Sequence, residues 1–221
     1  TSAYLDVNEL PSSFGGSYVA LVSPGYYSNI GARMDLTITP SAVLSGSVTV
    51  GKLRRPFTGK LVIQDDGTGL CDVWIPGSNT SAALPGIGLH LIFDLASHLN
   101  GDFSVVSATT ADNATIQGWR NVWNASTNVP APAGVDTFVL PGNGRYGHGY
   151  GTLAIGSSGS TIISGRLADD ASFATSATLG PQGEFMIYQP LYPEAGGVFG
   201  IAPIASATTE GAPDIIDATS A

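Results

Sequence analysis

The sequence feature that most constrains this chain is an alternation of apolar and small polar residues with a period of two, broken by short segments rich in Gly, Ser, Asp and Pro. Such alternation is typical of β-strands, and those four residue types favour tight turns. Because successive side chains of a strand point to opposite faces, one face of each strand is predicted to form core while the other meets solvent or a neighbour. In the second half of the chain the predicted strands cover residues 152–155, 161–167, 172–179 and 184–188.

The same succession of strands and turns occurs earlier in the chain, at an offset of about 119 residues between the Ser-Gly elements at Gly46 and Gly165. We therefore predict an internal repeat, with one unit at about residues 16–123 and a second at about residues 136–204. Two units with the same order of strands are expected to adopt similar β-structures.

The predicted fold is all-β: an antiparallel barrel or closed sandwich of about 12 to 14 short strands. It is built from two similar halves, which are related by pseudo-two-fold symmetry and share one core. Closure removes exposed edges from strands that carry few protective Lys residues. Residues 16–204 are predicted to form a single β domain, preceded by a lead-in segment at residues 1–15 and followed by an acidic C-terminal tail at residues 205–221.

The composition restricts the classes of partner. The chain has 221 residues, and a hydrophobic content of 43% is enough for a sizeable core. Its 17 acidic and 8 basic residues give a net charge of −9, which repels polyanions, so no nucleic acid is expected as a partner. No apolar run approaches the roughly 18 residues of a membrane span, so no membrane insertion is expected. Low charge and abundant Gly, Ser, Thr and Ala favour an extracellular or cell-surface location.

The chain shows no pattern that would hold a cofactor. It contains no HExxH, CxxC or glycine-rich phosphate loop, and its three histidines have no ligand spacing, so no cofactor is expected. The single cysteine, Cys71, cannot form an internal disulfide and alternates with Val73 and Ile75 on one predicted strand face. It is therefore predicted to be a buried core thiol.

Two groups of residues are candidates for ligand recognition. In one, two tryptophans flank an arginine, and an aromatic platform with a guanidinium donor suits a sugar; the alternative is that these aromatics fill the core or the space between sheets. In the other, a glycine-rich loop is either a flexible connection or a rim that presents aromatic and imidazole groups. The candidate ligand-binding residues are Trp119, Arg120, Trp123, Tyr146, His148 and Tyr150.

Two pairs of neighbouring carboxylates lie in predicted turns. Paired carboxylates either bind calcium through hard oxygen ligands or act as acid and base in glycoside hydrolysis. The first pair leads into a turn that contains Gly67, which is ordinary hairpin chemistry, and we favour turns over a metal or catalytic site. The weak metal candidates are Asp65, Asp66, Asp169 and Asp170.

Short motifs spread over residues 103–204 occur together in one known kind of module. They are Trp-Arg at 119–120, Trp-Asn-Ala at 123–125, Pro-Ala-Pro-Ala-Gly at 130–134, Val-Leu-Pro-Gly at 139–142, Gly-Tyr-Gly-Thr-Leu at 149–153, Ser-Gly-Arg-Leu-Ala-Asp at 164–169, Gln-Gly at 182–183, Tyr-Gln-Pro-Leu-Tyr at 188–192 and Gly-Gly at 196–197. In this combination the segment resembles the β-rich, repeat-bearing modules at the ends of very large secreted multidomain bacterial proteins. The resemblance implies an extracellular, β-barrel-like module, and it carries over no known activity.

These patterns predict a non-catalytic extracellular module with a structural, adhesive or assembly role. The alternative is a carbohydrate-binding module that uses exposed aromatics, and a glycoside-active enzyme is a third, less favoured interpretation. The expected partners are copies of the chain itself, neighbouring extracellular domains or glycans. Self-association would use β-addition of a terminal segment, residues 1–14 or 205–221, to a neighbouring sheet.

Overall fold

The computed structural model describes residues 10–25, 28, 30–77, 85–106, 111–140, 147–192 and 196–204. These residues form fifteen antiparallel strands and no α-helix, which confirms the predicted all-β class and slightly exceeds the expected number of strands. Within the described ranges, no helix is long and apolar enough to cross a membrane. The predicted lead-in, apart from residues 10–15, and the predicted tail lie outside the description.

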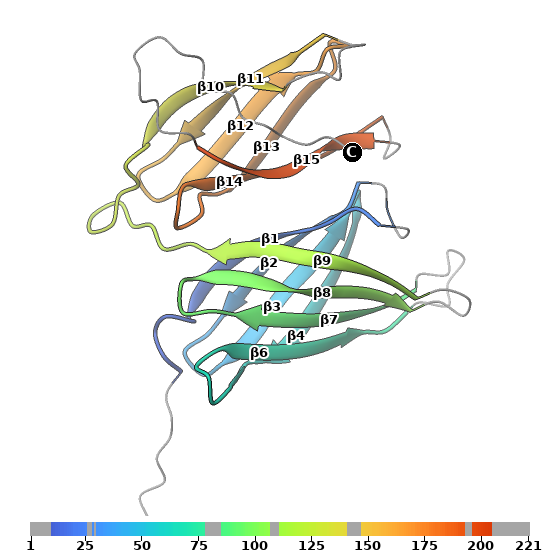
Figure 1. Cartoon of the computed structure of the whole chain (residues 1–221), viewed down its shortest axis with the longest axis vertical. Helices are drawn as coiled ribbons and strands as arrows, with labels where there is room; N and C mark the ends of the chain where they lie inside the picture. Colours follow the sequence, from blue (N-terminus) through green and yellow to red (C-terminus); the bar gives the residue numbers. More distant parts are fainter. Residues whose placement is uncertain are drawn as a thin grey trace, which may run out of the picture.

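The first half of the chain forms a nine-stranded, nearly closed, barrel-like sheet (Figure 1). Chain neighbours pair from β1 to β4 and from β5 to β9, and β1 also pairs with β9. At the remaining gap β4 lies beside β6, where Gly59 faces Cys71 and Val73. The strands are β1 (Gly16–Val22), β2 (Ala32–Ile38), β3 (Val43–Val50), β4 (Leu53–Lys60), β5 (Val62–Ile63), β6 (Gly69–Ile75), β7 (Gly86–Phe93), β8 (His98–Val106) and β9 (Ala111–Arg120).

The second half of the chain forms a four-stranded sheet and a separate hairpin. The sheet contains β10 (Gly134–Leu140), β11 (Gly149–Ile155), β12 (Ser160–Arg166) and β13 (Ser172–Thr178), paired in chain order as β1 to β4 are. The hairpin contains β14 (Glu184–Leu191) and β15 (Gly196–Pro203), and β13 lies beside β14. The internal repeat itself stays a prediction.

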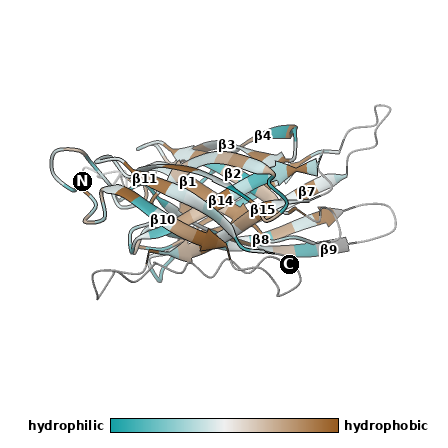
Figure 2. Ribbon diagram, turned by 90° about the horizontal axis from the view of Figure 1, so that it is seen from above, coloured by the Kyte–Doolittle hydropathy of each residue, from teal (hydrophilic) through white to brown (hydrophobic). Residues whose placement is uncertain are grey.

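The predicted alternation is visible strand by strand. In β2 Met34, Leu36 and Ile38 are buried, whereas the residues between them are more exposed, and in β11 Leu153 and Ile155 are buried in the same way. Figure 2 shows hydrophobic and hydrophilic residues alternating along single strands. The buried Cys71 confirms its predicted place on the inner face of β6.

The buried residues form three clusters, which differs from the single shared core that we expected. One fills the barrel and one lies between the four-stranded sheet and the β14–β15 hairpin. A third, small cluster lies between the two halves. The reason is the β1–β9 pairing: it closes the barrel around its own inward side chains, so only outward side chains remain to contact the second half.

Tyr18 of β1 is a buried phenol in the barrel core. It is 2% exposed, its hydroxyl donates a hydrogen bond to the Phe14 carbonyl at 2.9 Å, and its ring meets Phe93 edge-on at 5.1 Å. Burial raises its pKa to about 12, because the phenolate would lose its hydration.

We expect the stability of the protein to fall as the pH rises from 10 to 12. In this window Tyr18 ionises in the unfolded chain, whose pKa is about 10, but stays protonated in the folded chain. The unfolded state then binds fewer protons, and about 2 to 3 kcal/mol should be lost by pH 12. Urea unfolding at a series of alkaline pH values measures this loss, and Tyr18→Phe should remove that part of the slope. Equal slopes in the two proteins would contradict it.

Candidate functional site

Trp119, one of the residues proposed from the sequence, lies at the contact between the barrel and the second half, which we call the joint. It consists of the outward faces of β1 and β9 packed on β14, and its apolar members are Val19, Leu21, Trp119, Met186 and Tyr188. β14 is buried on both faces, because Phe185 and Ile187 point into the core of the second half while the joint covers the opposite face.

Trp119 is the largest side chain in the joint. It is 2% exposed, and its indole N–H donates a hydrogen bond to the Thr178 carbonyl of β13 at 2.8 Å. The ring therefore has no open face and no free N–H for a ligand. The prediction that Trp119 belongs to an exposed aromatic platform is wrong, because the second half of the chain covers the face on which it lies.

Trp123 is half-buried and follows the end of β9. Its indole N–H is shared between the carbonyls of Leu179 and Gly180, at 3.0 and 3.3 Å, and its ring packs against the core of the second half. It lies so close to Gly159 that a Cβ on that glycine would be 2.3 Å from the indole Cδ1. Trp123 thus holds the connection between the two halves, as the filler interpretation of these aromatics predicts.

The Arg120 side chain also forms hydrogen bonds within the protein. Its guanidinium donates to the carbonyls of Ser12 and Gly15, at 3.1 and 3.0 Å, and to the Ser97 hydroxyl at 3.1 Å. These bonds fix the segment before β1 to the turn between β7 and β8. Arg120 is therefore engaged within the fold, and its role as a ligand donor stays a prediction.

Polar bonds cross the joint beside its apolar cluster. The Tyr188 hydroxyl of β14 accepts a hydrogen bond from the Gly51 N–H at 2.9 Å and lies 3.5 Å from the Gly31 carbonyl. Tyr188 is buried, and both partners belong to barrel turns, because Gly31 directly precedes β2 and Gly51 lies between β3 and β4. The joint is therefore held by specific polar geometry as well as by apolar contact.

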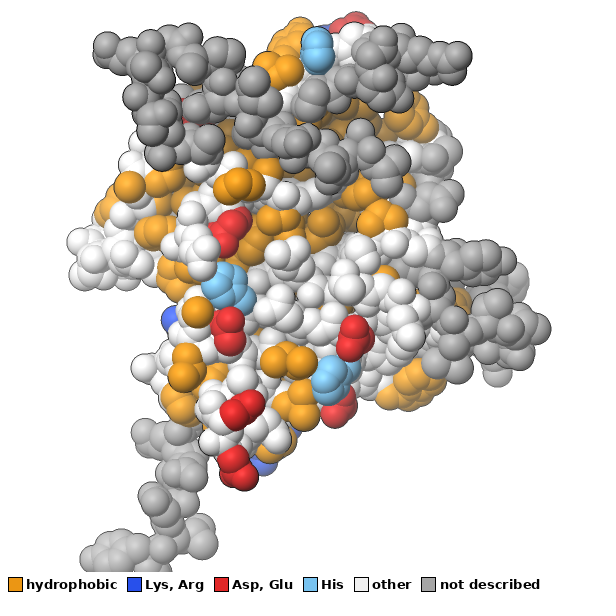
Figure 3. All heavy atoms as spheres, viewed as in Figure 1, with side chains coloured by type: hydrophobic (Ala, Val, Ile, Leu, Met, Phe, Trp, Pro, Cys, Tyr) orange, Lys and Arg blue, Asp and Glu red, His pale blue; other side chains and the backbone are white. Residues whose placement is uncertain are grey.

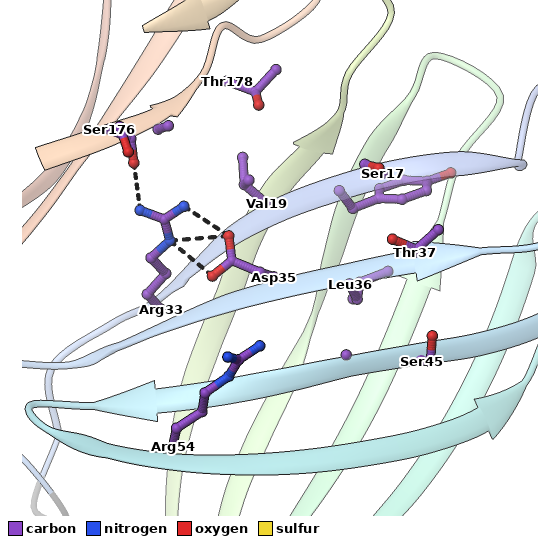
Figure 4. A pocket seen from close by; sticks show the side chains of 13 residues that line it. Ser17, Val19, Arg33, Asp35, Leu36, Thr37, Ser45, Arg54, Ser176 and Thr178 are labelled. Atoms are coloured by element: carbon purple, nitrogen blue, oxygen red, sulfur yellow. Dashed lines mark hydrogen bonds and ion pairs between the residues drawn. The ribbon is translucent and has the colours of Figure 1, made fainter. Parts of the chain in front are cut away.

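A groove of about 590 Å³ runs beside the joint, between the outer faces of β1 to β3 and the end of β13. Arg33 crosses it: the guanidinium donates to Asp35 at 2.7 Å and to the Ser176 carbonyl at 2.5 Å (Figure 4). Arg33 thereby links the barrel to the second half. The lining of the groove also includes Arg54 and the small hydroxyl-bearing residues Ser17, Thr37, Ser45, Ser176 and Thr178.

The glycosidase interpretation depends on how many carboxylates line the groove. Asp35 is the sole carboxylate among its lining residues, and it is paired with Arg33. Two carboxylates on either side of a bond are the usual requirement of glycoside hydrolysis. Across the described part of the chain, no three His, Cys, Asp or Glu side chains lie close enough together to hold a metal ion.

The loop candidates lie elsewhere. Tyr146 is outside the described residues, whereas His148 and Tyr150 are exposed, with Tyr150 at 61%. Tyr150 pairs across β11 and β12 with Arg166, which in turn pairs with Ser172 at the start of β13. Trp119 contacts the other end of β13. Among the described candidates, Trp119 and Tyr150 therefore do not belong to one site.

The first carboxylate pair belongs to a hairpin turn. Asp65 and Asp66 lie between β5 and β6, and Asp66 accepts hydrogen bonds from the Thr68 hydroxyl and backbone N–H at 2.7 and 2.9 Å. These bonds hold the pKa of Asp66 below its usual value, and the bond from the Thr68 hydroxyl has the larger effect. Gly67 adopts a φ of 83° in this turn, as the hairpin interpretation predicts.

The second pair is engaged in a similar way between β12 and β13. Asp169 accepts hydrogen bonds from the Tyr192 hydroxyl at 2.5 Å and the Ala171 N–H at 3.1 Å, which lower its pKa. Asp170 forms an ion pair with Arg166 at 2.5 Å. The two carboxylates thus have different partners, an arrangement that suits a turn rather than a shared cation.

Comparisons of the chain with protein-family models, with curated proteins and with solved structures found no match. The geometry of the joint is therefore what supports a function. Sequence reasoning did not single out Arg33, Asp35 or Tyr188 for it. The alternation in β2 places Arg33 and Asp35 on the outer face, but it carries no signal for the strand that covers them.

Proposed function

We propose that this chain is a non-catalytic extracellular module in which two β-structured halves form one rigid piece that serves a structural, adhesive or assembly role. The observation that carries the proposal is the joint: an apolar cluster, the Trp119 and Tyr188 hydrogen bonds and the Arg33 bridge all connect the same two halves. If the halves moved independently, the apolar cluster would be exposed to solvent and these hydrogen bonds would be broken.

Two further observations support a structural role over a catalytic one. The tryptophans and the arginine that suggested ligand recognition hold the fold together. The groove beside the joint offers one carboxylate, already paired with a guanidinium. The extracellular location rests on the low-charge composition and on the resemblance to modules of large secreted bacterial proteins.

Small-angle X-ray scattering tests the rigidity. We expect the intact chain to scatter as a single body at low and high salt, because the contacts of the joint are buried and salt screens buried contacts little. Met186→Asp, which places a charge at a joint position that is 1% exposed, should separate the halves and enlarge the radius of gyration.

Ile162→Asp provides the matched control, because it makes the same kind of change on a strand at a position that is 63% exposed. It should leave the scattering unchanged. A wild-type profile that requires an ensemble of separated halves would contradict the proposal. Hydrolysis of any substrate in a polysaccharide panel would contradict its non-catalytic part.

A further inference from the structure

Trp74 is an exposed tryptophan on the outer face of the barrel. It is 57% exposed, whereas Cys71, Val73 and Ile75 on the same strand are buried. Outward residues of a half-buried strand are usually small or polar, and large apolar side chains are usually buried. An outward tryptophan that no other element covers is therefore a candidate binding group.

The Trp74 ring rests on the backbone of β7, where two glycines leave room for it. A Cβ on Gly86 would lie 2.4 Å from both Cη2 and Cζ2 of the ring, and a Cβ on Gly88 would lie 3.9 Å from Cε3. The six-membered ring thus lies along the two glycines with one side on the sheet. Its exposed fraction shows that the other side meets solvent. The result is a fixed, flat aromatic surface.

Polar side chains extend the same face across the neighbouring strands. The strand register places Asp72, His90, Asp102 and Thr115 in one row from β6 to β9, two residues along from the row of Trp74. His90 Nδ1 lies 2.7 Å from an Asp72 carboxylate oxygen. Four strands span about 14 Å, the length of a short oligosaccharide. Figure 3 shows histidine and acidic side chains gathered on this side of the barrel.

The charge of the face limits what can bind there. No Lys or Arg occurs between Lys60 and Arg120, the segment that supplies β6 to β9, and Arg120 is held by backbone carbonyls. Phosphate, sulfate or uronate groups would be repelled by the Asp72 and Asp102 carboxylates, and no Lys or Arg between Lys60 and Arg120 would compensate. Neutral glycans fit the face, because carboxylates accept hydrogen bonds from hydroxyl groups and a flat ring packs against the C–H face of a pyranose.

We propose that this face, the outward side chains of β6 to β9 around Trp74, binds a neutral glycan, with a pyranose ring on the indole and sugar hydroxyls on Asp72, His90 and Asp102. The inference rests on the proposed function, to which it gives an adhesive ligand. The same Trp–Gly contact would also stabilise the sheet without any ligand, since an aromatic ring laid on strand glycines supports pairing. The experiment therefore has to separate binding from stability.

Affinity electrophoresis of the intact chain in gels that contain soluble polysaccharides makes this separation. The probes are neutral xylan, laminarin and hydroxyethyl cellulose, cationic chitosan and anionic polygalacturonate. Wild-type protein should be retarded by at least one neutral probe and not by polygalacturonate. Trp74→Ala should weaken that binding by about tenfold or more, the usual loss at a central aromatic contact. Gly86→Val, which displaces the ring and keeps the tryptophan, should weaken it similarly.

Ile162→Ala is the matched control, because it removes a highly exposed apolar side chain from a strand of the second half and should leave binding unchanged. Circular dichroism confirms that each variant is folded. The inference is overturned if no neutral probe retards the wild type, if only chitosan does, or if folded Trp74→Ala and Gly86→Val bind as the wild type does. If the protein scatters as a rigid body but binds no glycan, only the glycan-binding inference is contradicted. If it binds a glycan but scatters as separated halves, only the proposed rigidity is contradicted.

Discussion

Replacing Trp119 with alanine should lower the free energy of unfolding by about 3 to 5 kcal/mol, the usual cost of truncating a buried Trp or Phe. The side chain is 2% exposed in the joint, so its removal leaves a cavity between β1, β9 and β14. It also leaves the Thr178 carbonyl without the indole donor. Urea denaturation followed by circular dichroism measures the loss.

Two variants control for this result. Trp119→Phe keeps most of the apolar volume and loses the N–H, so it should cost clearly less than the alanine variant. Trp74→Ala removes the same side chain from a position that is 57% exposed, so it should cost much less than Trp119→Ala. Equal losses at Trp119 and Trp74 would mean that the joint contributes nothing of its own.

The second large effect is expected at Gly118 of β9, where the barrel closes. A Cβ at this position would lie 2.1 Å from the Val19 carbonyl oxygen and 2.5 Å from the Ala20 Cα. These are backbone atoms of β1, so the strands themselves have to separate to make room. We expect Gly118→Ala to cost about 3 kcal/mol, the upper part of the usual range for overpacking. Denaturation measures the cost, and hydrogen exchange should show reduced protection of the β1 amides.

Gly200→Ala makes the same chemical change in strand β15, where nothing lies within 4 Å of the new Cβ. It should change the stability by no more than about 0.5 kcal/mol. If Gly118→Ala is as mild as Gly200→Ala, close approach of β9 and β1 is not what limits position 118.

The strands of this protein follow from its sequence because their cause is local. Alternation along β6 placed Cys71, Val73 and Ile75 on the inner face, and all three are buried. The turn at Asp66 and Gly67 also forms as its residue types predict, since its hydrogen bonds close within a few residues. For such features the sequence neighbours and the structural neighbours are the same.

The role of the tryptophans could not be predicted in the same way. Trp119 and Trp74 both lie on the outer face of their strands, so the alternation with a period of two predicts the same orientation for both. Trp119 is covered by β14, which lies more than sixty residues later, and Trp74 is not covered by any described element. Alternation tells which face a side chain is on but not whether another part of the chain lies on that face.

Arg33 shows the same limit for polar residues. Its bond to Asp35 follows from the two-residue spacing in β2, but its bond to the Ser176 carbonyl depends on how the second half is placed. From the sequence, a charged side chain with one oppositely charged neighbour is predicted to form an ordinary surface ion pair. Its structural importance comes from a second partner that the sequence does not indicate.

The pairing of β1 with β9 also sets an order of events during folding. Val19 lies opposite Trp119, a hundred residues further along the chain, whereas the other barrel strands pair with chain neighbours. Such a distant pairing forms late, because its loop has to close before any contact compensates for the lost entropy. The surface that β14 covers is made of both strands, so it does not exist before they meet. The second half therefore has nothing to dock on until the barrel has closed, and the halves mature in the order in which synthesis delivers them.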